Sequence, residues 1–181
     1  MNVAALDPFG PALSPMALAA IVGLVWLYLS GAGRPRLVRE RVGSVRHTLF
    51  AAGAVLLALA FAGPLASAGP RLFAAHQVQH LLIRLLGPML IVLSHPWTVL
   101  RAGLPRRTRR GLRRFGNRPA GQISARVLSR LDVSFVLLIA ALYFWQIPVV
   151  HNAAVGMPPL ALFAHLSMTL VGLNFFAVVL D

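Results

Sequence analysis

Long apolar runs separated by short basic stretches dominate the pattern of hydrophobic and polar positions along this chain. A transmembrane helix needs about 20 mostly apolar residues to cross about 30 Å of hydrocarbon. The run at 52–63 is apolar throughout and lacks the alternation of a membrane β-strand. The pattern predicts an all-α, polytopic membrane helix bundle that forms a single domain over 1–181. About five transmembrane helices are expected, at residues 13–30, 47–66, 72–94, 133–150 and 159–180.

Composition agrees with a membrane protein and narrows its chemistry. Hydrophobic residues make up 58% of the chain, charged residues 12%, and the mean hydropathy is +0.77. A soluble domain carries roughly 25% charged residues. Cysteine is absent, which excludes disulfides, thiolate metal sites and cysteine nucleophiles.

The positive charges indicate an orientation. All 17 basic residues are arginines, against 4 acidic residues, and fifteen of the arginines lie in 31–46 and 95–132. The positive-inside rule makes both stretches cytoplasmic and puts the N-terminus outside. Residues 1–12 hold no arginine, unlike the start of a signal peptide. Lipid headgroups rather than nucleic acid are the expected partners of this charge.

Residues 95–131 form a basic cytoplasmic loop in this scheme. Within it, Gln122–Leu131 has apolar residues on one helical face, which predicts an amphipathic helix at the inner interface. The stretch Pro105–Pro119 is rich in Arg, Gly and Pro and is expected to be mobile. Trp145, at the outer end of the fourth helix, is expected to be an interfacial anchor.

Four of the six histidines share one predicted depth near the outer face. His76 and His80 lie in the first turns of the third helix, His151 in the outer loop after the fourth, and His165 early in the fifth. His47 and His95 fall at cytoplasmic ends instead, so topology alone separates the two groups.

The four outer histidines are candidate metal ligands. The i, i+4 spacing of His76 and His80 places both on one helix face, and ionisable groups at membrane depth are expensive. Without thiolates, neutral imidazoles suit copper best. Met157 and Met168 are expected to pack rather than ligate, and interhelical hydrogen bonding is an open alternative for every one of the histidines. A further alternative is a b-type cytochrome, with His80 and His165 as axial haem ligands.

Three other polar side chains occupy the predicted third helix. Arg84 lies near mid-membrane on the stripe of His76 and His80, with no acid of this chain at its depth. Gln77 and Gln79 flank the histidine pair and are expected to hydrogen-bond neighbouring helices.

Two stretches carry a family resemblance. HQVQHLLIRLLGPMLIVLSHPWTVLRAGLP (His76–Pro105) resembles the first block of the polytopic cytochrome c oxidase assembly factor CtaG family, associated with caa-type oxidases. Phe144–Phe176 resembles its second block, where a W-x-x-P-x-x-H turn precedes a helix with a buried histidine. The resemblance covers roughly residues 45–180. Family members usually continue with further helices, so a short form, a fragment and a specialised subunit remain open.

The resemblance implies a non-enzymatic role in maturing haem-copper oxidases. Its histidines match His76, His80, His151 and His165, which would hold or deliver copper on the periplasmic side. Oxidase subunits or copper chaperones are the implied partners, and a homo-oligomer remains open. A metal-free structural subunit of an oxidase complex is the remaining alternative.

Overall fold

The structure, a computed structural model, describes residues 15–34, 43–62 and 72–180. Within these residues it contains helices and no strand, as the all-α prediction requires. The predicted outer N-terminus and the short segment before the third helix lie outside the described residues.

A nearly continuous central helix organises the bundle. It consists of α4 (Phe73–Leu81), the π-helical turn η1 (Leu82–Leu86) and α5 (Gly87–Leu93). Pro88 has no N–H with which to bond the carbonyl four residues earlier, so an α-helix is interrupted there. The N–H of Gly87 reaches the carbonyl of Leu82, five residues back, and the chain stays helical through one wide turn.

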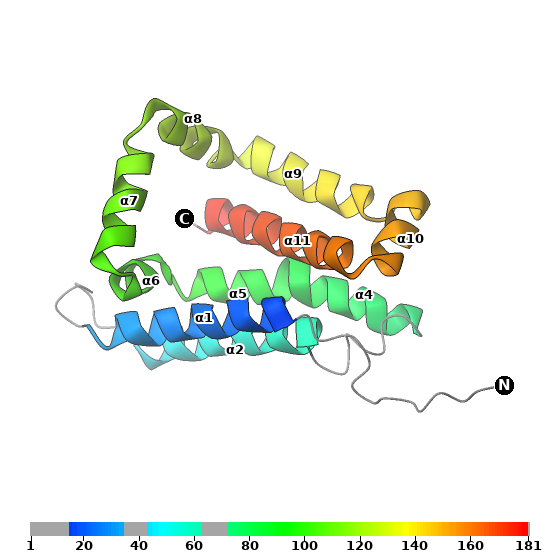
Figure 1. Cartoon of the computed structure of the whole chain (residues 1–181), viewed down its shortest axis with the longest axis horizontal. Coiled ribbons are helices and arrows are strands. Elements are labelled where there is room, and N and C mark those ends of the chain that lie inside the picture. Colours follow the sequence, from blue (N-terminus) through cyan, green and yellow to red (C-terminus); the bar gives the residue numbers. More distant parts are fainter. Residues whose placement is uncertain (1–14, 35–42, 63–71, 181) are drawn as a thin grey trace.

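Helix α2 (Ser44–Ala62) packs antiparallel along one side of the central helix (Figure 1). Two glycines allow this approach, because a β-carbon at Gly53 would lie 3.0 Å from the carbonyl oxygen of Gly87. Helix α11 (Pro158–Val179) packs on the central helix as well, against α5 and η1. The central helix therefore lies between α2 and α11 and provides much of the buried core, including Ile83 and Ile91.

Helix α1 (Pro15–Ala32) packs beside α2, and helix α6 (Trp97–Gly103) packs on α1. Gly31 and Gly103 let their backbones meet, since a β-carbon at either position would overlap a carbonyl oxygen of the facing helix. Arg34 donates a hydrogen bond of 2.8 Å from Nη1 to the carbonyl of Ala102. This arginine therefore ties the end of α1 to α6.

The arginine-rich loop is helical. Helix α7 (Arg106–Gly116) covers most of the stretch that we expected to be mobile, and its mobility stays a prediction. None of its residues is buried, which matches their charge. The predicted amphipathic helix is observed as α8 (Pro119–Leu128), which begins and ends three residues earlier than expected.

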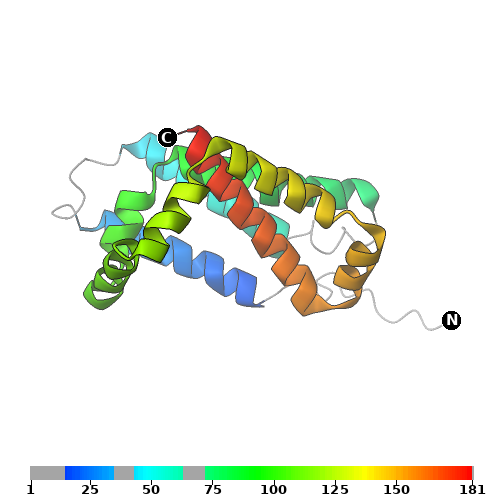
Figure 2. The same cartoon turned by 90° about the horizontal axis from the view of Figure 1, so that it is seen from above.

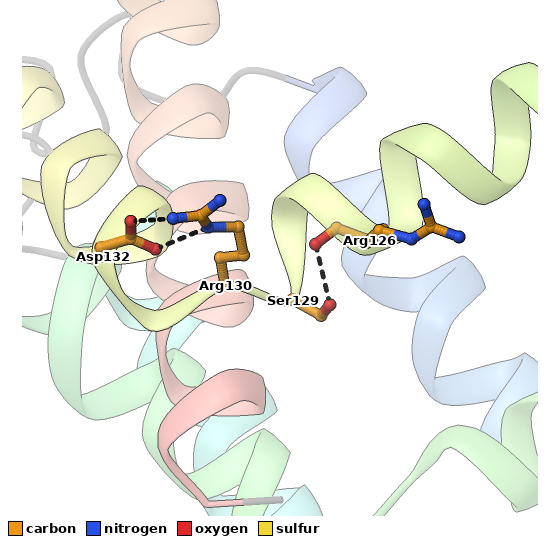
Figure 3. A network of polar contacts seen from close by, with 4 residues as sticks. All are labelled: Arg126, Ser129, Arg130 and Asp132. Carbon is orange, nitrogen blue, oxygen red and sulfur yellow. Dashed lines mark hydrogen bonds and ion pairs between the residues drawn. The ribbon is translucent and has the colours of Figure 1, made fainter.

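Helix α9 (Leu131–Phe144) meets α8 at a bend of 75°. At this junction Arg130 and Asp132 form a two-pronged ion pair, with Arg130 Nη2 to Asp132 Oδ2 at 2.7 Å (Figure 3). The hydroxyl of Ser129 donates to the carbonyl of Arg126 beside it. After Phe144 the chain turns into the short helix α10 (Pro148–Gly156), which leads to α11.

The predicted count of five spanning helices is not confirmed. By length and composition three helices of the described residues are able to cross a membrane, at Ser44–Ala62, Ala74–Leu93 and Pro159–Val179. A fourth is reached only if the bent α8–α9 pair is counted as one span. The fourth predicted span is wrong at its outer end, since α9 stops at Phe144. The described part of the first span, Met16–Ala32, falls short of a full crossing.

The predicted role of Trp145 is also wrong. We expected an interfacial anchor, but this side chain is 5% exposed and packs against Phe163 of α11. Its indole N–H donates to the hydroxyl of Ser167 at 3.0 Å. Trp145 thus joins the end of α9 to α11, and these antiparallel helices lie side by side in both views (Figures 1 and 2).

Candidate functional site

Four histidine side chains lie ring to ring at one end of the bundle, and we refer to them as the histidine row. The ring of His151 lies 5.2 Å from that of His76, measured between centroids. The ring of His76 lies 4.2 Å from that of His80, which lies 5.7 Å from that of His165. The structure therefore brings together all four predicted site residues, in the order His151, His76, His80, His165.

Three helices contribute to the histidine row. His76 and His80 come from successive turns of α4, as their i, i+4 spacing predicted. His165 faces them from the second turn of α11. His151 belongs to α10, a short helix within the connection between α9 and α11 where an outer loop was expected. The turn between α9 and α10, just before Pro148, directs this helix back toward the start of α4 (Figure 1).

The middle of the row is shielded from solvent. His80 is 7% exposed, and His76 is partly buried. The Nε2 atom of His76 is buried and has no hydrogen-bond partner among the described residues. A buried polar atom of this kind is uncommon in proteins and calls for an explanation, such as a water or an ion.

Imidazole groups suit a soft or borderline metal ion. The four rings, however, follow one another in a line and do not surround a common point. Two imidazoles on one metal, each at about 2.0 Å, have ring centroids roughly 4.5 to 6.5 Å apart. The three neighbouring pairs of the row lie near this interval. As placed, however, no group of three or more His, Cys, Asp or Glu side chains in the described part of the chain could hold one metal ion. Among the described residues the four rings are therefore arranged as neighbouring pairs and form no closed site.

Arg84 lies inward of the row and is 7% exposed. Its Nη2 donates to the sulfur of Met168 at 3.3 Å, and its Nε has no partner among the described residues. A thioether is a weak acceptor, so this contact satisfies the guanidinium poorly. Met168 is 1% exposed and packs in the core, in agreement with its predicted role.

The two glutamines of α4 differ in role. Gln79 is buried and donates from Nε2 to the carbonyl of Ala60 on α2 at 2.8 Å. This confirms the expected interhelical bond. Gln77 is exposed.

The other two histidines lie at the opposite end of the bundle. Nδ1 of His47 lies 3.3 Å from the hydroxyl of Tyr28, in a hydrogen bond between α2 and α1. His95 is exposed in the turn after α5, with a φ of 46°. Helices α6, α7 and α8, with their arginines, gather at that same end, away from α10 (Figure 1). The separation of the histidines into two groups is thus confirmed.

One neighbour of the row was missed from the sequence. Phe61, near the end of α2, packs edge-on against His165 with ring centroids 5.9 Å apart. Nothing in the sequence distinguishes Phe61 from other apolar residues of its helix. Only the tertiary structure, which brings the end of α2 close to α11, reveals the contact.

The fold and this site define an all-helical bundle with apolar, membrane-length helices and histidines gathered at one end. A family model described as cytochrome c oxidase caa3 assembly factor matches residues 26–181. The chain belongs to this family of oxidase assembly factors, as its two sequence blocks indicated. Neither the curated proteins nor the solved structures contain a match.

Proposed function

We propose that this assembly factor holds copper on the histidine row and passes it to the oxidase that it helps to assemble. Membership of the caa3 assembly factor family supports association with cytochrome c oxidase. The observation that carries the copper assignment is the row itself, with four adjacent imidazoles from three helices and one buried, unpartnered Nε2.

Copper is the cargo in this proposal, and the chemistry is ligand exchange. Neutral imidazole without thiolate or carboxylate suits copper, and Cu(I) accepts a low number of ligands. Since the described side chains offer pairs and no closed site, we infer that one ion is held by two neighbouring rings at a time. His151 and His76 form the first pair, and His80 and His165 form the inner one.

The orientation follows from charge. The arginines of α6, α7 and α8 lie at the end of the bundle opposite the row, and the positive-inside rule assigns that end to the cytoplasm. We therefore propose that the histidine row faces the outer, periplasmic side of a bacterial inner membrane. Copper chaperones on that side would be suitable donors.

The test is metal and haem quantification on the full-length protein purified in detergent. After anaerobic loading with Cu(I) and removal of excess ion, we expect stoichiometric copper in the wild-type protein. His76→Ala removes the outer pair and His80→Ala removes the inner pair, so each should weaken copper binding, and the double variant should abolish stoichiometric binding. The matched controls His47→Ala and His95→Ala, at the other end of the bundle, should retain it.

Other outcomes would overturn the proposal in identifiable ways. A Soret band in the absorption spectrum would favour the haem-binding alternative. Copper-free protein that still co-purifies with oxidase would indicate a structural subunit. Loss of copper in the His47 variant but not in the His76 variant would place the copper site at the end of the bundle opposite the histidine row.

A further inference from the structure

Arg84 is a buried cation for which the described chain provides no anion. Asp132 is the one acidic residue in the described ranges, and it pairs with Arg130 at the junction of α8 and α9. The guanidinium instead contacts the Met168 sulfur and leaves Nε without a partner there. An arginine does not lose its proton in proteins, so this positive charge persists.

The position of this charge relates it to the histidine row. Arg84 follows His80 by four residues along the central helix, and Met168 follows His165 by three along α11. The Arg84–Met168 contact therefore lies about one helical turn inward of the inner histidine pair. No histidine of the row lies beyond it.

A fixed positive charge beside a metal site discriminates by ionic charge. Coulomb repulsion is proportional to the charge of the bound ion, so a divalent ion is opposed twice as strongly as a monovalent one. At roughly 8 Å and an effective dielectric constant of about 20, one additional unit of charge corresponds to roughly 30-fold in affinity. Bulk salt screens such a buried interaction little.

We propose that Arg84 makes the histidine row selective for a monovalent metal ion over a divalent one and closes the inner end of the row. The inference rests on the proposed function and specifies its cargo as Cu(I). The closure also directs release outward, because an ion at His80 and His165 is repelled toward His76 and His151. Among the described residues Arg84 donates its hydrogen bond to Met168 and not to a histidine of the row, so it would act on the metal through its charge.

The experiment compares two ions on the full-length protein in detergent. Affinity for Cu(I) is measured anaerobically by competition with a chromophoric chelator, and affinity for Zn(II), which has no redox chemistry, is measured in the same way. For Arg84→Gln we expect the ratio of Cu(I) to Zn(II) affinity to fall at least about tenfold. The control Arg101→Gln, which removes an exposed charge from α6, should leave the ratio unchanged.

A second measurement needs no variant, in case Arg84→Gln does not fold. The Cu(II)/Cu(I) potential of copper bound to the wild-type protein should lie above that of copper with free imidazole in the same detergent. A potential at or below that reference overturns the inference, as does an unchanged affinity ratio in folded Arg84→Gln. Binding of neither ion to the wild-type protein overturns the proposed function as well, and so separates the two failures.

Discussion

The α-carbon of Gly172 on α11 packs against the backbone carbonyl oxygen of Arg84 in the π-helical turn η1. A β-carbon at residue 172 would overlap this oxygen and would lie 3.2 Å from the Cγ atom of Pro88. In a regular α-helix the N–H of residue 88 would bond the carbonyl of Arg84, but proline has no such group. The proline, the wide turn and the glycine thus form one packing unit.

This contact predicts that Gly172→Ala is destabilising. The added methyl meets backbone, which is unable to move aside as a flexible side chain does, and overpacking of this kind costs about 1–3 kcal/mol. The measurement is the Tm of the detergent-purified variant. As a control, Gly111→Ala on α7 meets open space and should keep or raise the Tm, because alanine favours helix. A Gly172→Ala variant as stable as the wild-type protein would contradict the predicted overlap.

The bond from Gln79 to Ala60 predicts an asymmetry between the two glutamines of α4. The last carbonyls of a helix lack intrahelical donors, and Gln79 supplies one to the end of α2. Gln79→Ala removes this donor and leaves a buried acceptor, at a cost of about 1–3 kcal/mol. Gln77 lies two residues earlier on the same helix and is exposed, so Gln77→Ala should leave the Tm unchanged. Equal losses in the two variants would show that the bond does not contribute.

The ion pair at the α8–α9 junction predicts a titration. Hydrogen bonding to Arg130 is the main cause that holds the pKa of Asp132 below its ordinary value of 3.8. The pair therefore favours the folded protein above that value, and this contribution disappears as the pH falls through the lowered pKa. The side chains are 63% and 62% exposed, so the effect on stability is small.

NMR titration of the Asp132 carboxyl group measures this directly. We expect a midpoint below 3.8 in the wild-type protein and a higher midpoint in Arg130→Gln. Arg126→Gln is the matched control, since the Arg126 guanidinium points away from Asp132 (Figure 3). If both variants raised the midpoint equally, the general positive charge of this region would be responsible, and the ion pair would not.

Helix content and helix order were predictable because they depend on local composition. The apolar segments at 47–66 and 159–180 correspond closely to α2 and α11. Hydropathy alone extended the fourth span too far, since the apolar character continues past Phe144 toward Val150 although the chain turns there. That turn depends on Pro148 and on the packing of Trp145 against α11, and hydropathy contains neither.

The sequence predicted which histidines come together in the candidate site, but it did not predict the order of their rings. The i, i+4 spacing of His76 and His80 guarantees a shared face, and the topology placed His151 and His165 at the same depth. The order of the rings along the row depends on how α10 folds back and how α11 crosses the central helix. The roles of these four residues as metal ligands stay a prediction.

The sequence by itself determined the apolar helices, the segregation of arginines from the outer histidines, and the restriction of any metal site to imidazole. These are properties of composition and spacing along one chain. The tertiary structure decided that Arg84 meets Met168, that Gly172 meets the Arg84 carbonyl, and that four rings form a row. Such contacts join residues far apart in sequence, and they exist only because close packing of α2, the central helix and α11 selects which faces meet.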